Sequence, residues 1–422
     1  MLFEKSFRLI IGVFVSSMLA RFLGPSNFGE LNFYISLLSI ATVLSSLGFS
    51  RIIVREVTKR IFHPNRVLEF ITTAFFLRLL SSVSIWLIAV IISLISFDGN
   101  TKYIFVIFFS LIFISFDTFD FYAQASSKFK IVSLCRFFSF LLSSCFKLIL
   151  IYFQVDLFLF IFSTLLEYII TALMFYLFLI KPNKLSLRIQ KFNFYESKIL
   201  LKESWPEIIA GCGAILFMRI DQIFLQVILG DNSVGIYTAG TRITEAWYFL
   251  PTAIVAATFP KLVSLKEESY EKYMAGVKII TSVLVLISII VAITFTFTSN
   301  YIVNILYGNE YIESAHVIIL HTWGSIFLCM GISSGSWLVA EKKLKLNLAR
   351  NIFGLVICAL ANYILIPLYG VQGSAISTVI GMASAFYLFD IFHPQLRRMF
   401  IIKTQSLLPI QLINLLIKKE LR

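Results

Sequence analysis

Twelve apolar segments dominate this sequence, and each approaches or exceeds the ~20 residues that a helix needs to cross a bilayer. Only 14% of the 422 residues are charged, whereas a soluble protein usually carries about 25% charged residues. The sequence therefore predicts an all-α integral membrane protein with about twelve transmembrane helices. The segments lie near residues 6–22, 31–50, 70–96, 103–124, 131–153, 155–180, 205–229, 235–259, 276–298, 314–338, 346–368 and 373–392.

The distribution of lysine and arginine predicts the orientation of these segments. Short cytoplasmic loops retain positive charge, and a cytoplasmic N-terminus leaves only Arg21 and Lys102 in the outward loops. We therefore expect a multi-pass protein with both termini in the cytoplasm. The net charge of +13 is spread over loops that face an anionic leaflet, so we expect contacts with membrane lipids and no nucleic-acid partner.

The cysteines and the short motifs argue against an enzyme or a metalloprotein. All five cysteines fall within apolar segments, without C-x-x-C spacing or a nearby histidine cluster, as small core residues do. A phosphate-binding loop and a nucleophile triad are also missing, and "GCG" at 211–213 lacks the continuation that a phosphate loop requires. We expect no enzymatic activity, no metal and no cofactor. The cysteines are Cys135, Cys145, Cys212, Cys329 and Cys358.

Two short motifs indicate an internal repeat. "LGPSNFG" (23–29) and "LGDNSVG" (229–235) share the pattern L-G-x-x-x-x-G at a displacement of 206 residues, close to half the chain. A glycine just past a helix end, followed by polar residues, stops one helix and allows the next to begin. Each motif therefore predicts a short outward hairpin loop, and the pair indicates a duplication.

A basic polar stretch divides the twelve segments into two sets of six. Each half then has an even number of spans, so both halves enter the membrane in the same direction as parallel repeats. We expect the substrate cavity between them. The predicted divisions are an N-terminal lobe over 1–180, a cytoplasmic basic linker over 181–202, a C-terminal lobe over 203–392 and a cytoplasmic interfacial tail over 393–422.

Three longer stretches carry a resemblance to a known family. They are "ARFLGPSNFGELNFYISLLSIATVLSSLGFSRIIVRE" (20–56), "RIDQIFLQVILGDNSVGIYTAGTRITEAWYFLPTAIVAATFPKL" (219–262) and "IPLYGVQGSAISTVIG" (366–381). They look like the polysaccharide-exporting flippases of bacterial O-antigen and related glycan pathways. That family belongs to the multidrug/oligosaccharidyl-lipid/polysaccharide exporter superfamily, and the likeness covers nearly the whole chain.

This resemblance implies a substrate, a location and a direction of transport. The substrate would be an undecaprenyl-diphosphate-linked oligosaccharide, moved from the cytoplasmic to the periplasmic leaflet of a bacterial inner membrane. Implied partners are this lipid-linked oligosaccharide and the polysaccharide assembly machinery. The resemblance also implies a V-shaped protein of two six-helix lobes that works by alternating access.

Several ionisable residues lie inside the apolar segments, where exposure of a charge to lipid costs about 2.5–3.5 kcal/mol or more. Asp221 and Arg242 are equally distant from a turn centred between Asp231 and Asn232, which predicts equal depth on two antiparallel helices. An ion pair between them would lock this hairpin, and Arg242 can also engage substrate. Glu245 can complete the cluster, and either carboxylate can take up a proton.

Arg219 stands two residues from Asp221 in "MRIDQIFL" (218–225). Residues i and i+2 lie about 200° apart on a helix, so these two side chains do not pair with each other. Gln222 and Gln226, at i+3 and i+7, extend the polar face of Arg219. We expect this stripe to line a water-filled substrate cavity.

Four arginines of the N-terminal half are further candidates for substrate binding. Arg78 lies at depth within the third segment. Arg21 ends the first segment, and Arg51 and Arg55 close the second. The family resemblance implies substrate contact by these last three, while their positions at helix ends equally allow contacts with lipid headgroups.

Three acidic residues of the N-terminal half are candidates for ion coupling. Asp117 and Asp120 lie one helical turn apart in "SFDTFDF", and Glu167 lies inside the sixth segment. Two carboxylates on one face can share a proton, as a coupled carrier requires. They can also simply pair with Arg78 or Lys147, which we favour.

His316 and His321 begin the tenth segment. Histidine titrates near neutral pH and can couple transport to protons. A single histidine near a membrane interface is more often a hydrogen-bonded structural residue, so both interpretations stay open.

Other protein classes fit the sequence less well than a flippase. A drug/cation antiporter of the same superfamily would rely on acidic and aromatic residues more than on arginines. An integral-membrane glycan polymerase or glycosyltransferase usually needs a large outward loop, and every outward loop here is short. A passive structural partner would leave the arginines inside the membrane unexplained. Arginine suits a diphosphate because its planar fork binds two oxygens at once.

Overall fold

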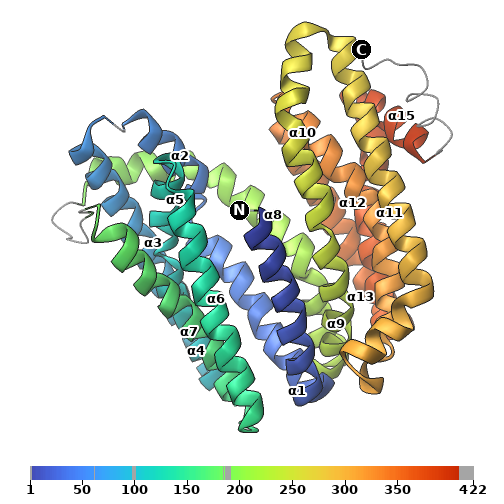
Figure 1. The fold of residues 1–422 in the computed structure, drawn as a ribbon, viewed down its shortest axis with the longest axis horizontal. Helices are drawn as coiled ribbons and strands as arrows, with labels where there is room; N and C mark the ends of the chain where they lie inside the picture. Colours follow the sequence, from blue (N-terminus) through green and yellow to red (C-terminus); the bar gives the residue numbers. More distant parts are fainter. Residues whose placement is uncertain (1, 61, 97–100, 184, 186–191, 408–422) are drawn as a thin grey trace. The chain divides into compact units, whose positions relative to one another are not determined.

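The described chain is built of helices in the computed structural model (Figure 1), which describes residues 2–60, 62–96, 101–183, 185 and 192–407. Those residues contain no strand, since a helix satisfies every backbone hydrogen bond within its own segment, as a bilayer requires. Ten of the described helical stretches are long and apolar enough to cross a membrane. The predicted all-α membrane fold is confirmed.

The two longest stretches, Phe7–Lys59 and Leu344–Phe392, contain 53 and 49 residues. Each is interrupted by a glycine outside the helical region, Gly24 (φ 69°) and Gly370 (φ 59°). Gly24 therefore divides the first part of Phe7–Lys59, up to Ser45, into two helices, and Gly370 divides Leu344–Ala383 in the same way. The predicted break at Gly24 is confirmed, as is its counterpart at Gly230 (φ 85°). The number of twelve crossings stays a prediction.

The chain forms two compact units. Unit 1 comprises the residues up to Leu23 together with Glu30–Ile215. Unit 2 comprises Gly24–Gly29 together with the residues from Leu216 onward. Helix α8 (Phe194–Leu229) therefore contributes its first part to unit 1 and its last part to unit 2.

In unit 1 the short amphipathic helix α2 places Phe49, Ile53 and Val57 in a core with residues of the neighbouring helices. Its opposite face carries Arg51 and Arg55, which are exposed. The helices of unit 1, besides α8, are α1 (Leu2–Ser45, apart from Gly24–Gly29), α2 (Phe49–Lys59), α3 (Pro64–Ser96), α4 (Thr101–Ile114), α5 (Asp117–Ala125), α6 (Phe129–Tyr152), α7 (Leu157–Phe175) and the π-helix η1 (Tyr176–Ile180).

Unit 2 is organised around α12 (Ser314–Ala340), which packs against α9, α11 and α13. Small residues allow this close approach of helix backbones: a Cβ on Gly324 would lie 3.0 Å from the side chain of Val379 on α13. The other elements are α9 (Asp231–Trp247), α10 (Phe249–Glu268), α11 (Tyr270–Leu306), η3 (Asn309–Tyr311), α13 (Leu344–Ala383), the π-helix η4 (Ser384–Leu388), α14 (Phe389–Phe392), η5 (Pro394–Leu396) and α15 (Arg397–Ser406).

Helix α15 belongs to the core of unit 2. Met399 and Ile402 pack in one apolar cluster with Trp337. The amine of Lys403 is fully buried, lies 2.6 Å from Oδ2 of Asp390 and donates a hydrogen bond to the carbonyl oxygen of Phe386 at 2.5 Å. Residues 397–406 of the predicted interfacial tail are thus docked on protein, while 408–422 lie outside the described residues.

The two L-G-x-x-x-x-G motifs meet inside unit 2. A Cβ on Gly29 would lie 1.8 Å from the carbonyl oxygen of Asp231, and a Cβ on Gly235 would lie 1.9 Å from the carbonyl oxygen of Pro25. Pro25 and Asp231 occupy equivalent positions of the two motifs, as do the two glycines, so the contact is reciprocal. This symmetry supports the predicted duplication.

Candidate functional site

Asp221 is buried in unit 2, with 3% of its surface exposed, and its carboxylate accepts four hydrogen bonds. Oδ2 accepts from the hydroxyls of Tyr237 on α9 (2.8 Å) and Thr378 on α13 (2.7 Å). Oδ1 accepts from the amide of Asn362 (2.7 Å) and the thiol of Cys358 (3.4 Å), both on α13. The last part of α8 and two other helices therefore converge on one carboxylate.

A second layer of polar groups surrounds this carboxylate. Nε2 of His321 lies 3.0 Å from the hydroxyl oxygen of Tyr237, and Ser374 donates to the side-chain oxygen of Asn362 at 3.0 Å. Nδ1 of His321 is buried and has no hydrogen-bond partner among the described residues. A continuous chain of hydrogen bonds thus leads from His321 through Tyr237 to Asp221.

This arrangement suits a carboxylate whose charge changes during function. In the part of the chain that the structure describes, no lysine, arginine or histidine forms an ion pair with Asp221. A buried carboxylate without a cationic side chain can be neutralised by a proton or by a small cation. Among the described residues there is no group of three or more histidine, cysteine, aspartate or glutamate side chains that could hold a metal.

The predicted ion pair between Asp221 and Arg242 is wrong. Helix α8 ends at Leu229 and α9 begins at Asp231, so the turn is centred on Gly230, not between Asp231 and the following residue. Asp221 then lies nine positions before the centre and Arg242 twelve after it, so their depths differ by roughly 4–5 Å at 1.5 Å per residue. Counting residues from the turn predicts only the depth of a side chain, not the direction in which it points. Asp221 points toward α13, where it contacts Asn362 and Thr378.

Arg219 pairs with Glu245 instead, at 3.9 Å between Nη1 and Oε1. The predicted polar stripe of Arg219, Gln222 and Gln226 does not form one exposed wall. Gln222 is buried, and Gln226 donates to the carboxylate of Asp231 across the turn at 2.8 Å. Arg219, whose side chain is 23% exposed, and Gln226 are both partly exposed.

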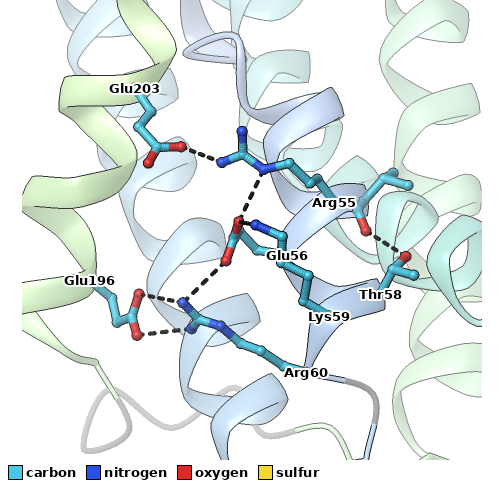
Figure 2. A network of polar contacts seen from close by, with 8 residues as sticks. Arg55, Glu56, Thr58, Lys59, Arg60, Glu196 and Glu203 are labelled. Atoms are coloured by element: carbon cyan, nitrogen blue, oxygen red, sulfur yellow. Dashed lines mark hydrogen bonds and ion pairs between the residues drawn. The ribbon is translucent and has the colours of Figure 1, made fainter.

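Arg51 and Arg55, predicted from the family resemblance, lie on the polar face of α2 and contact acidic residues of α8. Figure 2 shows the contacts of Arg55. Arg55 binds Glu203 through Nη2 and its neighbour Glu56 through Nε, the latter at 3.0 Å. Arg51 lies 3.3 Å from Glu207. The side chains of Arg51 and Arg55 remain 71% and 50% exposed, so both guanidinium groups stay accessible to a ligand.

A third ion pair continues this contact along the two helices. Arg60 binds both carboxylate oxygens of Glu196 at 2.8 and 3.3 Å. Arginine positions rise along α2 while glutamate positions fall along α8, so the helices form an antiparallel ladder of ion pairs. We call this set the α2–α8 ladder. It consists of the pairs Arg60–Glu196, Arg55–Glu203 and Arg51–Glu207.

Arg78 is enclosed in unit 1, with 2% of its surface exposed. It donates to the hydroxyl of Thr118 at 3.1 Å and lies 5.5 Å from the ring centre of Phe121. Its predicted role in a substrate cavity is therefore not supported by the geometry, because protein covers it. Arg21 is exposed at the end of the first part of α1, and its role stays a prediction.

The acidic candidates of unit 1 form ion pairs. Asp117 and Asp120 both contact Nη2 of Arg136, at 2.9 and 2.6 Å. Pairing is thus what the geometry shows for them, but the partner is Arg136 on α6, not Arg78 or Lys147.

Glu167 holds two basic side chains. Its Oε2 lies 3.8 Å from the amine of Lys147, and its Oε1 lies 3.4 Å from Nη2 of Arg8. These side chains join three helices of unit 1, namely α1, α6 and α7. The contact therefore has a structural explanation without ion coupling.

Sequence reasoning missed most of the Asp221 site and the acidic half of the α2–α8 ladder. Asn362 and Thr378 lie 141 and 157 positions from Asp221, and single polar residues in apolar segments give no spacing that links them. Tyr237 lies only 16 positions away, on the other side of the Gly230 turn. The acidic residues of the ladder had a usable pattern, because Glu196, Glu203 and Glu207 are spaced by seven and four, which places them on one helix face.

The chain matches a protein-family model, described as polysaccharide biosynthesis protein, over residues 5–266, more than half of its length. Over 391 residues it is 23% identical to a putative O-antigen transporter of Shigella flexneri, a match covering 89% of this chain and 92% of that protein. Over 204 residues it is 22% identical to a probable low-salt glycan biosynthesis flippase of Haloferax volcanii, covering 48% of this chain and 43% of that protein. The chain thus spans less than half the length of this second relative.

Solved structures share the fold. An inward-facing multidrug resistance MATE family transporter of the MOP superfamily superimposes with a TM-score of 0.75 at 17% identity, covering 96% of each chain. The lipid II flippase MurJ in an inward closed conformation gives a TM-score of 0.72 at 16% identity, covering 99% of this chain and 92% of that one. With the family match over residues 5–266, these findings confirm the resemblance seen in the sequence: the chain belongs to the polysaccharide biosynthesis protein family.

Proposed function

We propose that this chain is a flippase that moves an undecaprenyl-diphosphate-linked oligosaccharide from the cytoplasmic to the periplasmic leaflet of a bacterial inner membrane by alternating access. Family membership supports a role in polysaccharide biosynthesis. The relatives described as an O-antigen transporter and a glycan biosynthesis flippase support transport of a lipid-linked glycan. The strong bias of basic residues supports cytoplasmic termini, and the polysaccharide assembly machinery is the proposed protein partner.

The observation that carries this proposal is the exposed arginine pair on α2. Arg51 and Arg55 are one helical turn apart, with Cβ atoms about 5–6 Å from each other. A diphosphate can accept hydrogen bonds from both guanidinium forks at once. The polyprenyl tail is soluble in the bilayer, so the protein has to shelter only the charged, sugar-bearing head.

The Asp221 site supplies a means of driving the transport. A proton or small cation that enters Asp221 as the headgroup leaves would couple the two movements. The membrane potential adds to this, because moving two negative charges outward across 100 mV is favourable by about 4–5 kcal/mol. Arg219 and Arg242 then serve as candidate contacts for the headgroup during transport.

The test of the proposed function is leaflet accessibility in vesicles. Purified chain should move an undecaprenyl diphosphate-linked oligosaccharide away from the leaflet where a membrane-impermeant glycosidase can reach it. The double variant Arg51→Ala/Arg55→Ala should flip at least about tenfold more slowly, since each charge-assisted contact is worth about 1.5 kcal/mol or more.

Arg397→Ala/Arg398→Ala is the matched control, because it removes the same charge from exposed positions of α15. It should flip at the wild-type rate. Full transport by the α2 variant would remove the arginine pair from the mechanism. Failure of folded wild type to flip several different glycans would remove the proposed function itself.

Coupling through Asp221 gives a separate prediction. An imposed proton or sodium gradient should accelerate flipping by the wild type, while Asp221→Asn should flip at one slow rate with or without the gradient, because asparagine cannot carry a proton or a charge. Asp231→Asn, at the start of α9, should behave like the wild type. Retention of gradient-driven acceleration by Asp221→Asn would exclude this carboxylate as the coupling group.

One observation favours a second candidate function. A buried carboxylate surrounded by hydroxyl and amide groups also suits a drug/cation antiporter, the alternative within the same superfamily. That function predicts gradient-driven efflux of an organic cation that depends on Asp221 and is unaffected by loss of Arg51 and Arg55. The same pair of variants therefore separates the two functions.

A further inference from the structure

The exposed arginines of α2 each face a carboxylate on α8. Glu203 binds Arg55, and Glu207 lies 3.3 Å from Arg51. The two glutamates are four positions apart on α8, as the two arginines are on α2, so the pairs stand side by side. Any anion that reaches these guanidinium groups must therefore compete with two carboxylates.

The protein fixes this arrangement at both ends. At one end, a Cβ on Gly48 would lie 2.9 Å from Cβ of Glu207 and 2.9 Å from the backbone nitrogen of Ile208, so the start of α2 lies directly on α8. At the other end, the bidentate pair of Arg60 and Glu196 is the least exposed of the ladder, at 23% and 18%. The two carboxylates in between are thus held beside the arginines by the packing of the helices.

A diphosphate site in a membrane has to distinguish its ligand from the headgroups of the surrounding phospholipids. Basic residues of an amphipathic helix bind the headgroups of anionic phospholipids, which greatly outnumber any lipid-linked intermediate. A headgroup with a single phosphate can satisfy one guanidinium while it is repelled by the neighbouring carboxylates. A diphosphate carries more charge on two phosphorus atoms and can bridge both guanidinium groups, replacing both carboxylates at once.

We propose that Glu203 and Glu207 are specificity-determining residues, which allow a lipid-linked diphosphate to occupy Arg51 and Arg55 and reject a headgroup with a single phosphate. This inference rests on the proposed function, in which the arginine pair receives the diphosphate. Exposed ion pairs are individually weak, so the carboxylates can be displaced by a ligand that makes two bidentate contacts. Specificity then arises from repulsion of the wrong headgroup as well as attraction of the right one.

The test compares two lipids that differ in one phosphate. Binding of undecaprenyl diphosphate and of undecaprenyl monophosphate is measured on the full chain in nanodiscs made of a zwitterionic lipid. Wild type should prefer the diphosphate. In Glu203→Gln/Glu207→Gln the affinity for the monophosphate should rise by about threefold to tenfold, since two weak competing ion pairs are removed, and the preference for the diphosphate should fall by a similar factor.

The choice of glutamine keeps the size of the side chain and an oxygen that accepts a hydrogen bond from arginine, so the helices stay in register. If the double variant does not fold, each single variant should show part of the same change. Glu268→Gln is the matched control: it neutralises an exposed glutamate that pairs with Lys272, and its preference should equal that of the wild type.

A soluble competitor separates recognition of the headgroup from partitioning of the lipid. Excess inorganic pyrophosphate should displace the diphosphate lipid from wild type, and inorganic phosphate should not. Equal displacement by the two anions, or an unchanged preference in every Glu203 and Glu207 variant, would overturn the inference. If the wild type binds and flips the diphosphate lipid but the variants keep its preference, the proposed function stands and the role of the two glutamates is wrong. If the wild type neither binds nor flips this lipid, the proposed function and the role of the two glutamates are both contradicted.

Discussion

Alanine at Gly29 or at Gly235 is expected to destabilise unit 2 by more than about 4 kcal/mol, a loss that single substitutions rarely cause and that overpacking can produce. The added Cβ would lie 1.8 or 1.9 Å from a carbonyl oxygen of the opposite motif. Both partners are backbone atoms at the starts of helices, so no side-chain rotation can relieve the clash. The measurement is the midpoint of unfolding in detergent, together with the yield of monodisperse protein.

Gly12→Ala is the control for this pair. A Cβ on Gly12 would meet only the ring of Phe140 at 3.7 Å, which is an ordinary contact, and alanine in a helix interior is favoured over glycine by about 1 kcal/mol. This variant should unfold at or above the wild-type midpoint. If Gly235→Ala matched Gly12→Ala, the reciprocal contact between the two motifs would be wrong.

Replacement of Lys403 by methionine is expected to cost about 3–5 kcal/mol, as the loss of one partner of a buried ion pair does. Asp390 would be left as a buried carboxylate whose salt bridge is broken, and the carbonyl oxygen of Phe386 would lose a donor. Burial lowers the pKa of the Lys403 amine to about 8, so the amine is still protonated and paired at neutral pH. The measurement is again the shift of the unfolding midpoint at neutral pH.

The double variant Lys403→Met/Asp390→Leu tests the reason for that loss. Removing both charges leaves no unpaired carboxylate, and apolar replacement of a whole buried pair is often neutral or stabilising. Most of the stability lost in Lys403→Met should therefore return. A double variant as unstable as the single one would show that the charge on Asp390 is not the cause, and that shape or the Phe386 contact matters more.

The membrane fold and the helix breaks can be predicted from the sequence because each depends on residues close together in the chain. Apolar length defines a helix that can cross a bilayer, and Gly24 and Gly230 break helices where the pattern of glycine and polar residues predicts it. The displacement of 206 residues also identified the two motifs that meet in space. It could not show that they touch, because contact depends on how the helices pack.

The candidate sites were less accessible to sequence reasoning because they depend on which way each helix faces. Depth alone pairs Asp221 with Arg242, and the observed turn at Gly230 changes even that depth. Arg51 and Arg55 were found through family resemblance, whereas their partners Glu203 and Glu207 were missed. Lys403 lies in a segment whose basic ends resemble an interfacial tail, and its burial follows from the apolar face of α15.

The proposed flippase function is tested most directly by the distribution of a lipid-linked oligosaccharide between the two leaflets of vesicles in which all copies of the chain have the same orientation. With the substrate supplied at the leaflet next to α2 and a cation gradient imposed, we predict net accumulation of the oligosaccharide in the opposite leaflet. A distribution equal to that of protein-free vesicles would contradict it.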